Sequence, residues 1–356
     1  MRKVILISLV LVLLASVFVF AGGGQQGAGK KIVGIALPTK EQPIWPAQGN
    51  ALTKIFTDAG YQVIIEYAED MPERQIMQIE NMITRGCKYL IITAVDTFSL
   101  TDICEKAKDA GIKIISSDRL IMNTKNVDYY VSFDLIRNGI LLGEGVEKGL
   151  GLKEGKKGPF TLEIFSGSPD DSNSVPFYDG AMSVLKKYLD NGTLVVKSGQ
   201  VSLGVTGILK WDSALAQARM DNILGAYYTD TRLDAVVAAA DCLAIGIISS
   251  LDSMGYGKSA DLPFPVVTGQ DCEITAIKAI IAGQQYMSVY LDPVVMSEKM
   301  FGVVDSLDKG TAINPDAHYN NGTIEVPAIT YDPVYIDKSN YNLLVERGFY
   351  TEADLR

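Results

Sequence analysis

The sequence predicts an α/β protein made of two doubly wound lobes, each built on a parallel sheet. Apolar runs rich in β-branched residues alternate with helical segments along nearly the whole chain, a pattern typical of buried parallel strands. The alternation restarts near residue 134, and 356 residues are more than one hydrophobic core usually holds. Two successive sets of strands and helices therefore predict two lobes.

The first set of elements lies before residue 134. Glycines at Gly60, Gly86 and Gly111 mark expected helix ends, because glycine commonly follows the last helical turn. The last helix of this set is expected to begin with a capping box at Ser99–Asp102. The expected strands are Ile32–Leu37, Tyr61–Ala68, Tyr89–Val95, Ile112–Ser117 and Tyr129–Phe133.

The second set opens with an expected helix over Ile136–Leu150 and a polar loop at Ser166–Ser174. Another long helix is expected over Val294–Asp308, before the closing strand. The expected strands are Phe160–Phe165, Leu194–Ser198, Ala235–Ala240, Val266–Thr268, Tyr286–Leu291 and Glu325–Tyr331. Most are short and apolar, as expected for strands covered by helices on both faces.

The first thirty residues have the pattern of an export signal followed by a linker. Arg2 and Lys3 precede an apolar run from Val4 to Ala21, which is typical of a signal peptide over residues 1–21. Residues 22–30 are rich in glycine and are expected to form a flexible leader. The apolar run is also long enough for an uncleaved membrane anchor, but cleavage is favoured because no second apolar span follows. No cysteine lies near Ala21, so the acylated cysteine of a lipoprotein is missing.

The net charge bears on possible partners, and the cysteine content bears on possible disulfides. The formal net charge of −10 argues against nucleic acid, whose phosphates require a basic face. Four cysteines in an exported protein could pair, and Cys242 and Cys272 each directly follow an aspartate at the end of a predicted strand. The alternative, that all four are small buried residues with free thiols, is favoured.

Several catalytic and cofactor-binding patterns are missing from the sequence. His318 is the single histidine and is expected to be a solvated loop residue, which leaves little room for histidine-assisted nucleophiles or histidine-rich metal sites. The loop 38–46 after the first predicted strand has no glycine, and no GxxxxGK[ST] motif occurs. These absences exclude the common dinucleotide and phosphate-binding loops. We therefore expect no cofactor and no metal.

Four of the apolar runs end on an aspartate: Asp96, Asp118, Asp241 and Asp271. In parallel α/β sheets the carboxyl ends of the strands line the ligand crevice. Carboxylates gathered there accept several hydrogen bonds, which suits a ligand rich in hydroxyl groups such as a sugar. Two alternatives stay open: a pair of carboxylates could serve a glycosidase as acid and base, or each aspartate could cap the helix that follows it.

Aromatic and polar residues accompany these aspartates. Trp45 and Trp211 are the only tryptophans and lie in segments that are poor candidates for a core. Indole rings suit the apolar C–H faces of a pyranose and leave the hydroxyls to polar groups. Side chains that could complete a hydrogen-bond network around a sugar are Lys40, Arg119, Asn173 and Gln270.

Several short motifs spread over residues 31–356 carry a family resemblance. They are Ala36–Lys40, Gln78–Met82, Ser117–Ile121, Gly167–Asp171, Tyr178–Ser183, Trp211–Asp212, Ala218–Asn222, Ala244–Ser250 and Gly269–Asp271. Together they resemble periplasmic sugar-binding proteins of ABC transporters. The similarity is to the multiple-sugar receptors that bind aldoses such as galactose, glucose and arabinose, followed by the xylose-binding proteins.

The resemblance implies a periplasmic binding protein of type I, in which three crossovers form a hinge between the lobes. The N-terminal sugar-binding lobe would hold residues 31–133 plus 289–312, and the C-terminal lobe residues 134–288 plus 313–356. The hinge would close around the ligand, and the closed form would be recognised by a membrane permease.

The resemblance also implies which residues contact the sugar. At Ile44 the chain departs from the multiple-sugar branch, which tends to have a basic residue there, so the preferred epimer stays open. The implied contacts are Lys40, Trp45, Asp96, Asp118, Arg119, Asn173, Trp211, Asp241 and Gln270.

We therefore expect a monomeric periplasmic receptor that captures an aldohexose or aldopentose, such as galactose, glucose, arabinose or xylose, and delivers it unchanged to an ABC permease. Whether a chemoreceptor or sensor kinase also docks stays open. The alternative is a secreted carbohydrate-active enzyme. A sugar-responsive transcription regulator is excluded, because a signal peptide occupies the terminus where its DNA-binding helices would be needed.

Overall fold

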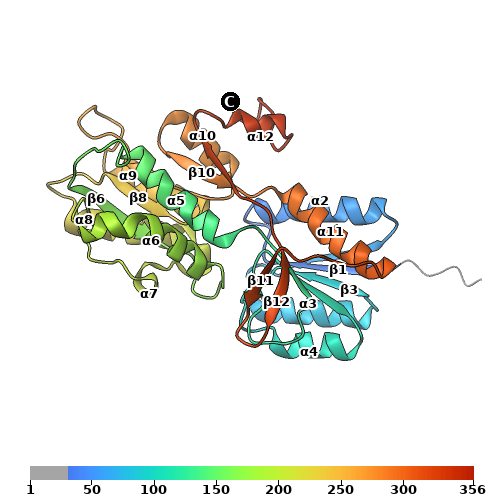
Figure 1. Cartoon of the computed structure of the whole chain (residues 1–356). Coiled ribbons are helices and arrows are strands. Elements are labelled where there is room, and N and C mark those ends of the chain that lie inside the picture. Colours follow the sequence, from blue (N-terminus) through green and yellow to red (C-terminus); the bar gives the residue numbers. More distant parts are fainter. Residues whose placement is uncertain (1–30) are drawn as a thin grey trace, which may run out of the picture.

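The computed structural model describes residues 31–356, which form two lobes joined by crossing segments (Figure 1). The expected signal peptide and leader, residues 1–30, lie outside the described residues. None of the helices within residues 31–356 is long and apolar enough to cross a membrane.

A seven-stranded sheet forms the centre of the N-terminal lobe, in the order β11-β12-β5-β4-β3-β1-β2. All neighbours pair in parallel except β11 and β12, which are antiparallel at one edge. The strands are β1 (Ile32–Leu37), β2 (Gln62–Tyr67), β3 (Tyr89–Ile92), β4 (Lys113–Ser117), β5 (Tyr129–Val131), β11 (Ala317–Asn320) and β12 (Glu325–Ile329).

Helices cover both faces of this sheet, which explains its continuous apolar strands. Ile35 and Leu37 of β1 belong to the core on the side of α2 and α11, whereas Ala36 belongs to the core on the side of α3 and α4. The helices are α2 (Ile44–Asp58), α3 (Pro72–Thr84), α4 (Thr101–Asp109) and α11 (Pro293–Lys309).

The C-terminal lobe contains a parallel sheet in the order β7-β6-β8-β9 and an antiparallel pair of β10 and β13. A bridge between Gln270 and Val289 links the two sheets. The strands are β6 (Phe160–Phe165), β7 (Leu194–Val195), β8 (Ala235–Ala238), β9 (Val266–Val267), β10 (Met287–Tyr290) and β13 (Val334–Asp337). The helices are α5 (Leu135–Gly149), α6 (Ser174–Asp190), α7 (Leu203–Thr206), the 3-10 helix η1 (Leu209–Trp211), α8 (Ser213–Tyr227), α9 (Asp241–Ser253), α10 (Ile274–Ala282) and α12 (Asn342–Glu346).

Helices α5 and α6 approach each other closely at two glycines. A Cβ atom on Gly139 would lie 2.2 Å from the carbonyl oxygen of Phe177, and one on Gly180 would lie 2.4 Å from that of Ile136. Any side chain at either position would push the helices apart. The start of α6, which leads out of the interlobe region, is therefore held against the start of α5.

Three segments cross between the lobes, at residues 132–134, 291–292 and 330–333. Two of them run side by side, because Ser132 donates its amide to the carbonyl of Ile329 (3.2 Å) and Asp134 donates to that of Tyr331 (3.0 Å). The predicted fold class, two doubly wound α/β lobes with a three-crossover hinge, is confirmed.

The predicted boundary at residue 313 is wrong, because β11 and β12 complete the N-terminal sheet. Strand β12 pairs in parallel with β5, and its Val326 and Ala328 are fully buried in the N-terminal core. The chain enters the C-terminal lobe again only with β13, which pairs with β10. His318 is exposed, as expected, but lies in β11 and not in a loop.

Two other local expectations can be compared with the structure. The expected capping box is absent. Helix α4 follows Leu100, whose apolar side chain makes no capping hydrogen bond. The hydroxyl of Ser99 donates instead to the carbonyl of Asp96 (3.1 Å). All four cysteines are free thiols, and only Cys242 is partly exposed.

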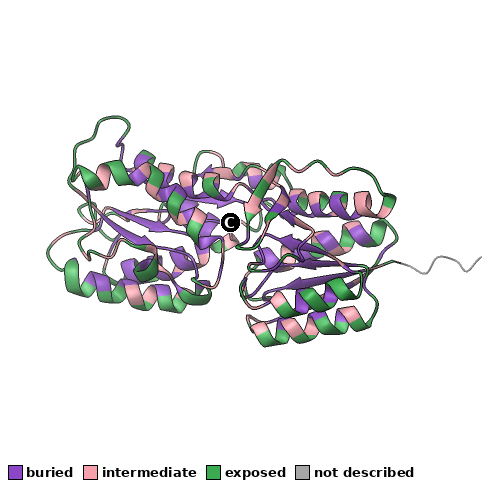
Figure 2. Cartoon of the chain, turned by 60° about the horizontal axis from the view of Figure 1, so that its bottom comes forward, coloured by how far each residue is buried: buried purple, intermediate pink, exposed green. Residues whose placement is uncertain are grey.

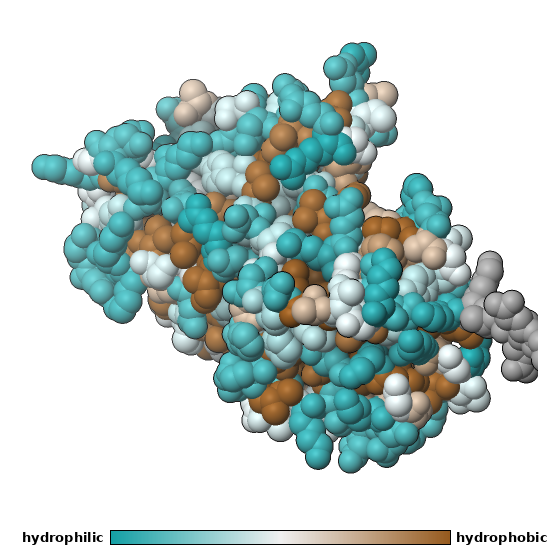
Figure 3. Space-filling model, turned by 45° about the vertical axis from the view of Figure 1, so that its right-hand side comes forward, coloured by the Kyte–Doolittle hydropathy of each residue, from teal (hydrophilic) through white to brown (hydrophobic). Residues whose placement is uncertain are grey.

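The burial pattern follows the layered architecture. In Figure 2 most strands of both lobes are buried, while the outward faces of the helices are exposed. Figure 3 shows one face of the molecule, on which hydrophilic side chains predominate and hydrophobic ones are scattered among them.

Asp308 attaches α11 to the amino-terminal ends of strands β1, β2 and β3. Its carboxylate accepts hydrogen bonds from Lys31, from Lys88 (2.9 Å) and from the hydroxyls of Tyr89 (2.6 Å) and Tyr61 (3.1 Å). Although desolvation opposes it, this set of donors holds the pKa of Asp308 well below its usual range. A helix that arrives after a crossover is therefore joined to strands near the start of the chain.

We expect Asp308→Asn to lower the free energy of unfolding by about 1–3 kcal/mol near neutral pH, because two lysines and two tyrosines lose a charged acceptor. Since the pKa is depressed in the folded state, this stabilisation is fully present above the unfolded pKa near ~4 and is lost progressively as the pH falls from there through the folded pKa. Urea denaturation should therefore show a difference from the parent that is largest at pH 7 and smaller at pH 3. Asp58→Asn, in an exposed pair with Lys54, is the control and should change little. Equal stability of Asp308→Asn and parent at pH 7 would refute the role of this cluster.

Candidate functional site

A cavity of about 360 Å³ lies between the lobes, at the carboxyl ends of the strands. This is where parallel α/β sheets bind ligands. The N-terminal lobe contributes Gln42, Trp45, Asp118 and Arg119 to its walls. The C-terminal lobe contributes Asp171, Asn173, Phe177, Trp211, Ala240, Cys242, Gln270 and Asp271.

Turns that follow strands place most of these side chains. Asp118 and Arg119 come directly after β4, and Asp118 has φ 59°, in the left-handed region that non-glycine residues rarely adopt. Asp171 and Asn173 lie between β6 and α6, and Asp271 follows β9 with φ 95°. Non-glycine residues in this conformation are typical of functional sites, because the surrounding structure must hold them there.

The two tryptophans both line the cavity, one from each lobe. Trp45 donates its indole N–H to Gln42 (2.9 Å), and Trp211 donates its N–H to Asp171 (3.1 Å). The guanidinium of Arg119 lies 5.2 Å from the centroid of the Trp45 ring. Both indoles are therefore fixed in orientation before any ligand enters.

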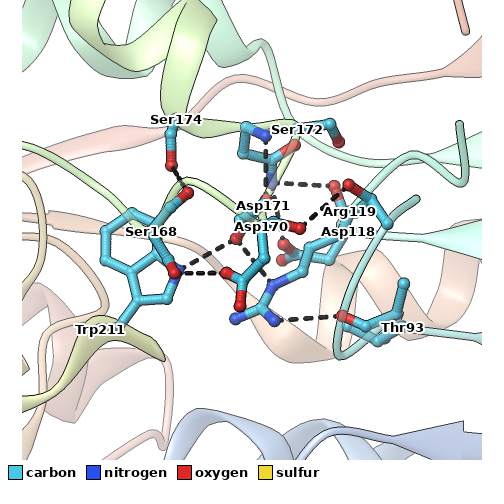
Figure 4. A network of polar contacts seen from close by, with 12 residues as sticks. Thr93, Asp118, Arg119, Ser168, Asp170, Asp171, Ser172, Ser174 and Trp211 are labelled. Atoms are coloured by element: carbon cyan, nitrogen blue, oxygen red, sulfur yellow. Dashed lines mark hydrogen bonds and ion pairs between the residues drawn. The ribbon is translucent and has the colours of Figure 1, made fainter. Parts of the chain in front are cut away.

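An ion pair crosses the cavity from one lobe to the other. The Nε atom of Arg119 lies 2.8 Å from Oδ2 of Asp171, and both side chains are almost fully buried. Arg119 also donates to the carbonyl of Ala94 (3.1 Å), and the amide of Asn173 donates to Asp171 (2.9 Å). Figure 4 shows this network, with Trp211 on the far side of Asp171 from Asp118.

Further hydrogen bonds join the lobes around the cavity. Asn173 donates to the carbonyl (3.1 Å) and the carboxylate (3.2 Å) of Asp118. Ser172 donates to the carbonyl of Leu120 (3.1 Å), and Lys210 donates to that of Asp70 (3.2 Å). The structure is therefore a closed arrangement of the two lobes.

The cavity holds more negative than positive groups. Asp118, Asp171 and Asp271 face a single guanidinium, that of Arg119. Burial raises the pKa of Asp118 to about 7 and that of Asp271 to about 6, although Arg119 opposes both shifts. Burial also raises the pKa of Asp171. Such a site offers many acceptors to a ligand that brings hydrogen-bond donors.

The structure brings six of the nine predicted residues to the cavity and leaves three outside. The six are Trp45, Asp118, Arg119, Asn173, Trp211 and Gln270. Lys40 is exposed, with its ammonium 5.1 Å from the ring centroid of Tyr67. Asp96 accepts a hydrogen bond from the amide of Phe98 (2.8 Å) and so stabilises its own turn.

Asp241 is fully buried behind the cavity wall, and the expected sugar contact at this residue is not part of the arrangement. Its carboxylate accepts from Gln285 (2.7 Å), from the hydroxyl of Ser288 (2.8 Å) and from the amide of Glu273 (3.0 Å). These three donors occupy the carboxylate within the C-terminal lobe. The residue after it, Cys242, faces the cavity instead.

Sequence reasoning did not propose Gln42, Asp171, Phe177, Ala240, Cys242 and Asp271 as contacts. Asp271 carried the same signal as the chosen residues, an aspartate directly after a strand. Asp171 lies at the end of the motif Gly167–Asp171, where its neighbour Asp170 was an equal candidate. Gln42 had no local signal, because its place depends on the path of the loop after β1. Among residues 31–356 no group of three histidine, cysteine or acidic side chains could hold a metal ion.

Comparison with known proteins places this geometry in a family. The model of the periplasmic binding protein domain matches residues 33–312. The multiple sugar-binding periplasmic receptor ChvE of Rhizobium radiobacter is 48% identical over 332 residues, which cover 92% of this chain and 93% of the receptor. The D-xylose-binding periplasmic protein of Escherichia coli is 31% identical over 325 residues, with 91% and 92% covered.

A solved structure shows the same architecture. An ABC transporter solute-binding protein from Clostridium phytofermentans, determined with bound β-D-glucose, superposes with a TM-score of 0.87 at 42% identity. The superposition covers 92% of this chain and all of that protein.

We expect the ligand-free protein to open as the pH rises from about 5 to 8. In an open, solvated cleft Asp118 and Asp271 would have pKa values near their usual ~4, whereas burial in the closed arrangement raises them to about 7 and about 6. The closed form therefore binds more protons than the open form, so closure is favoured at low pH and is lost as the pH rises through 6 to 7. The radius of gyration from small-angle X-ray scattering should increase over this range.

Two variants test whether the cavity carboxylates cause this change. Asp118→Asn should weaken the pH dependence, because the amide does not titrate. Asp96→Asn, outside the cavity, should keep the parent's dependence. A radius of gyration that is constant with pH in the parent would contradict the linkage between protonation and closure.

Proposed function

The chain belongs to the periplasmic binding protein family, and we propose that it captures a monosaccharide between its lobes and delivers it to an ABC importer. The observation that carries the proposal is the cavity itself. Two indole walls from opposite lobes enclose a space that is lined with carboxylates, one guanidinium and three amide side chains, Gln42, Asn173 and Gln270. This combination fits the apolar faces and the hydroxyl rim of one sugar ring.

The proposed ligand is an aldohexose or aldopentose, such as glucose, galactose, arabinose or xylose. Support comes from the relatives, whose names state binding of multiple sugars and of D-xylose, and from the similar structure with bound β-D-glucose. The proposed contacts are Gln42, Trp45, Asp118, Arg119, Asp171, Asn173, Trp211, Gln270 and Asp271. The ligand is released unchanged, since the relatives are binding proteins and transport receptors.

Binding and closure are coupled in this proposal. A sugar that contacts Asp118 and Arg119 in one lobe and Asp171 and Asn173 in the other interacts fully only with the closed form. Such a ligand shifts the equilibrium towards closure by its differential affinity for that form. The permease would then recognise the closed, loaded protein.

We further propose that the protein is a monomer, that it is exported to the periplasm by a cleaved signal peptide, and that a chemoreceptor or sensor kinase is a second candidate partner. The periplasmic location is the one named for the curated relatives. The alternative of a secreted carbohydrate-active enzyme has no support among these relatives.

A panel of aldoses tests the proposal. A sugar that binds only the folded protein raises its melting temperature, and calorimetry should then give one site with a Kd near micromolar, about −8 kcal/mol. Incubation with aryl glycosides should release no sugar. Failure of every aldohexose and aldopentose to bind, or release of reducing sugar in proportion to protein, would overturn the proposal.

The two tryptophans should report binding, because both indoles line the cavity and no other tryptophan dilutes their emission. A bound aldose should change the intrinsic fluorescence in a saturable way. Trp45→Phe and Trp211→Phe should each reduce affinity by about 1–2 kcal/mol, since each loses part of the stacking surface and an indole donor. Parent-like affinity in both variants would place the sugar elsewhere.

A further inference from the structure

The turn that presents Asp271 to the cavity is strained. Asp271 has φ 95° and the following Cys272 has φ 52°, so two successive non-glycine residues occupy the left-handed region. Each such residue is disfavoured unless its surroundings hold it. The direction of the Asp271 carboxylate therefore depends on the hydrogen bonds that other segments make with the backbone of this turn.

The C-terminal lobe holds the turn through its backbone amides. The amide of Asp271 donates to the carbonyl of Val289 (2.8 Å), and the amide of Cys272 donates to the hydroxyl of Ser288 (3.1 Å). The amide of Glu273 donates to Asp241 (3.0 Å). Asp241 also accepts from Ser288 (2.8 Å), so this buried carboxylate supports the turn from two directions.

The carbonyl of Cys272 is held by a different part of the chain. It accepts a hydrogen bond of 2.8 Å from the hydroxyl of Tyr350, which is 78 residues away in the segment after α12. The Tyr350 ring packs on Phe349, with centroids 4.7 Å apart, and Phe349 packs on Tyr290 of β10 at 5.1 Å. Leu344 of α12 is fully buried with Cys272 in the same small core. The hydroxyl is therefore fixed, although Tyr350 does not line the cavity.

We propose that Tyr350 is a positioning residue for the ligand site: by holding the carbonyl of Cys272 it keeps the strained turn in the conformation that aims Asp271 at the ligand. This inference rests on the proposed sugar-binding function. Without the hydrogen bond, the peptide between Cys272 and Glu273 keeps only the bond from its N–H to Asp241, and its carbonyl can shift. A shift of the carboxylate by a fraction of an ångström weakens a hydrogen bond to a ligand hydroxyl.

The same segment also reaches the hinge. Arg347 lies 3.3 Å from the carboxylate of Asp292, and Asp292 caps the first turn of α11 by accepting from the amides of Val294 (3.0 Å) and Val295 (3.2 Å). The segment 347–350 thus touches both the ligand turn and a crossover between the lobes. A ligand contact at Asp271 and the position of the hinge share one support.

The test compares Tyr350→Phe with the parent, using the aldose that raises the parent's melting temperature most. Calorimetry should show a three- to tenfold weaker Kd for Tyr350→Phe. The matched control is Tyr178→Phe, which also removes a hydroxyl bonded to a backbone carbonyl (Val201, 3.0 Å) in the same lobe but away from the turn. Its affinity should equal that of the parent.

A double-mutant cycle separates positioning from general stability. In an Asp271→Asn background Tyr350→Phe should cause little further loss, whereas in an Asp118→Asn background its full effect should persist. Parent-like affinity of Tyr350→Phe, or an equal loss in both backgrounds, would overturn the inference. If the parent itself binds no aldose, the proposed function fails and not the role of Tyr350.

Discussion

The ion pair between Arg119 and Asp171 joins the two lobes in a space from which water is nearly excluded. A buried pair of this kind is tolerated only when its remaining hydrogen-bonding capacity is satisfied, because desolvation of both charges opposes it. Here the guanidinium also donates to the Ala94 carbonyl, and the carboxylate of Asp171 also accepts from the Trp211 indole and the Asn173 backbone amide. The orientation of the aromatic wall and the loop before α6 therefore depend on this contact.

The same contact defines what a ligand must replace. In the closed arrangement Asn173 is bonded to Asp118, and Arg119 to Asp171, so the protein satisfies much of its own polar surface. A ligand gains affinity only where its hydroxyls make better contacts with both lobes than the lobes make with each other. Specificity among sugars of the same size then reflects which ring positions can donate to the three cavity carboxylates without leaving one unpaired.

The layered fold was predictable because each buried strand is a continuous apolar run, and strands such as β1 and β6 were placed at their observed bounds. The rule that the carboxyl ends of parallel strands line the ligand crevice also placed Asp118 at the site. It could not separate Asp118 from Asp241, because the difference depends on Gln285 and Ser288, which arrive from elsewhere in the lobe. The edge position of β12 was not predictable either, since its pairing with β5 is a contact between segments about 200 residues apart.

The path of the chain has a consequence for how the protein is made. The N-terminal lobe takes its first strands from the start of the chain but closes its sheet with β12 and β11, near the end. During synthesis β5 remains an open sheet edge, and α11, with the Asp308 cluster, is also missing until late. The lobe that emerges first from the ribosome is thus completed only after almost the whole chain has been translated, and no contiguous fragment contains it without most of the C-terminal lobe.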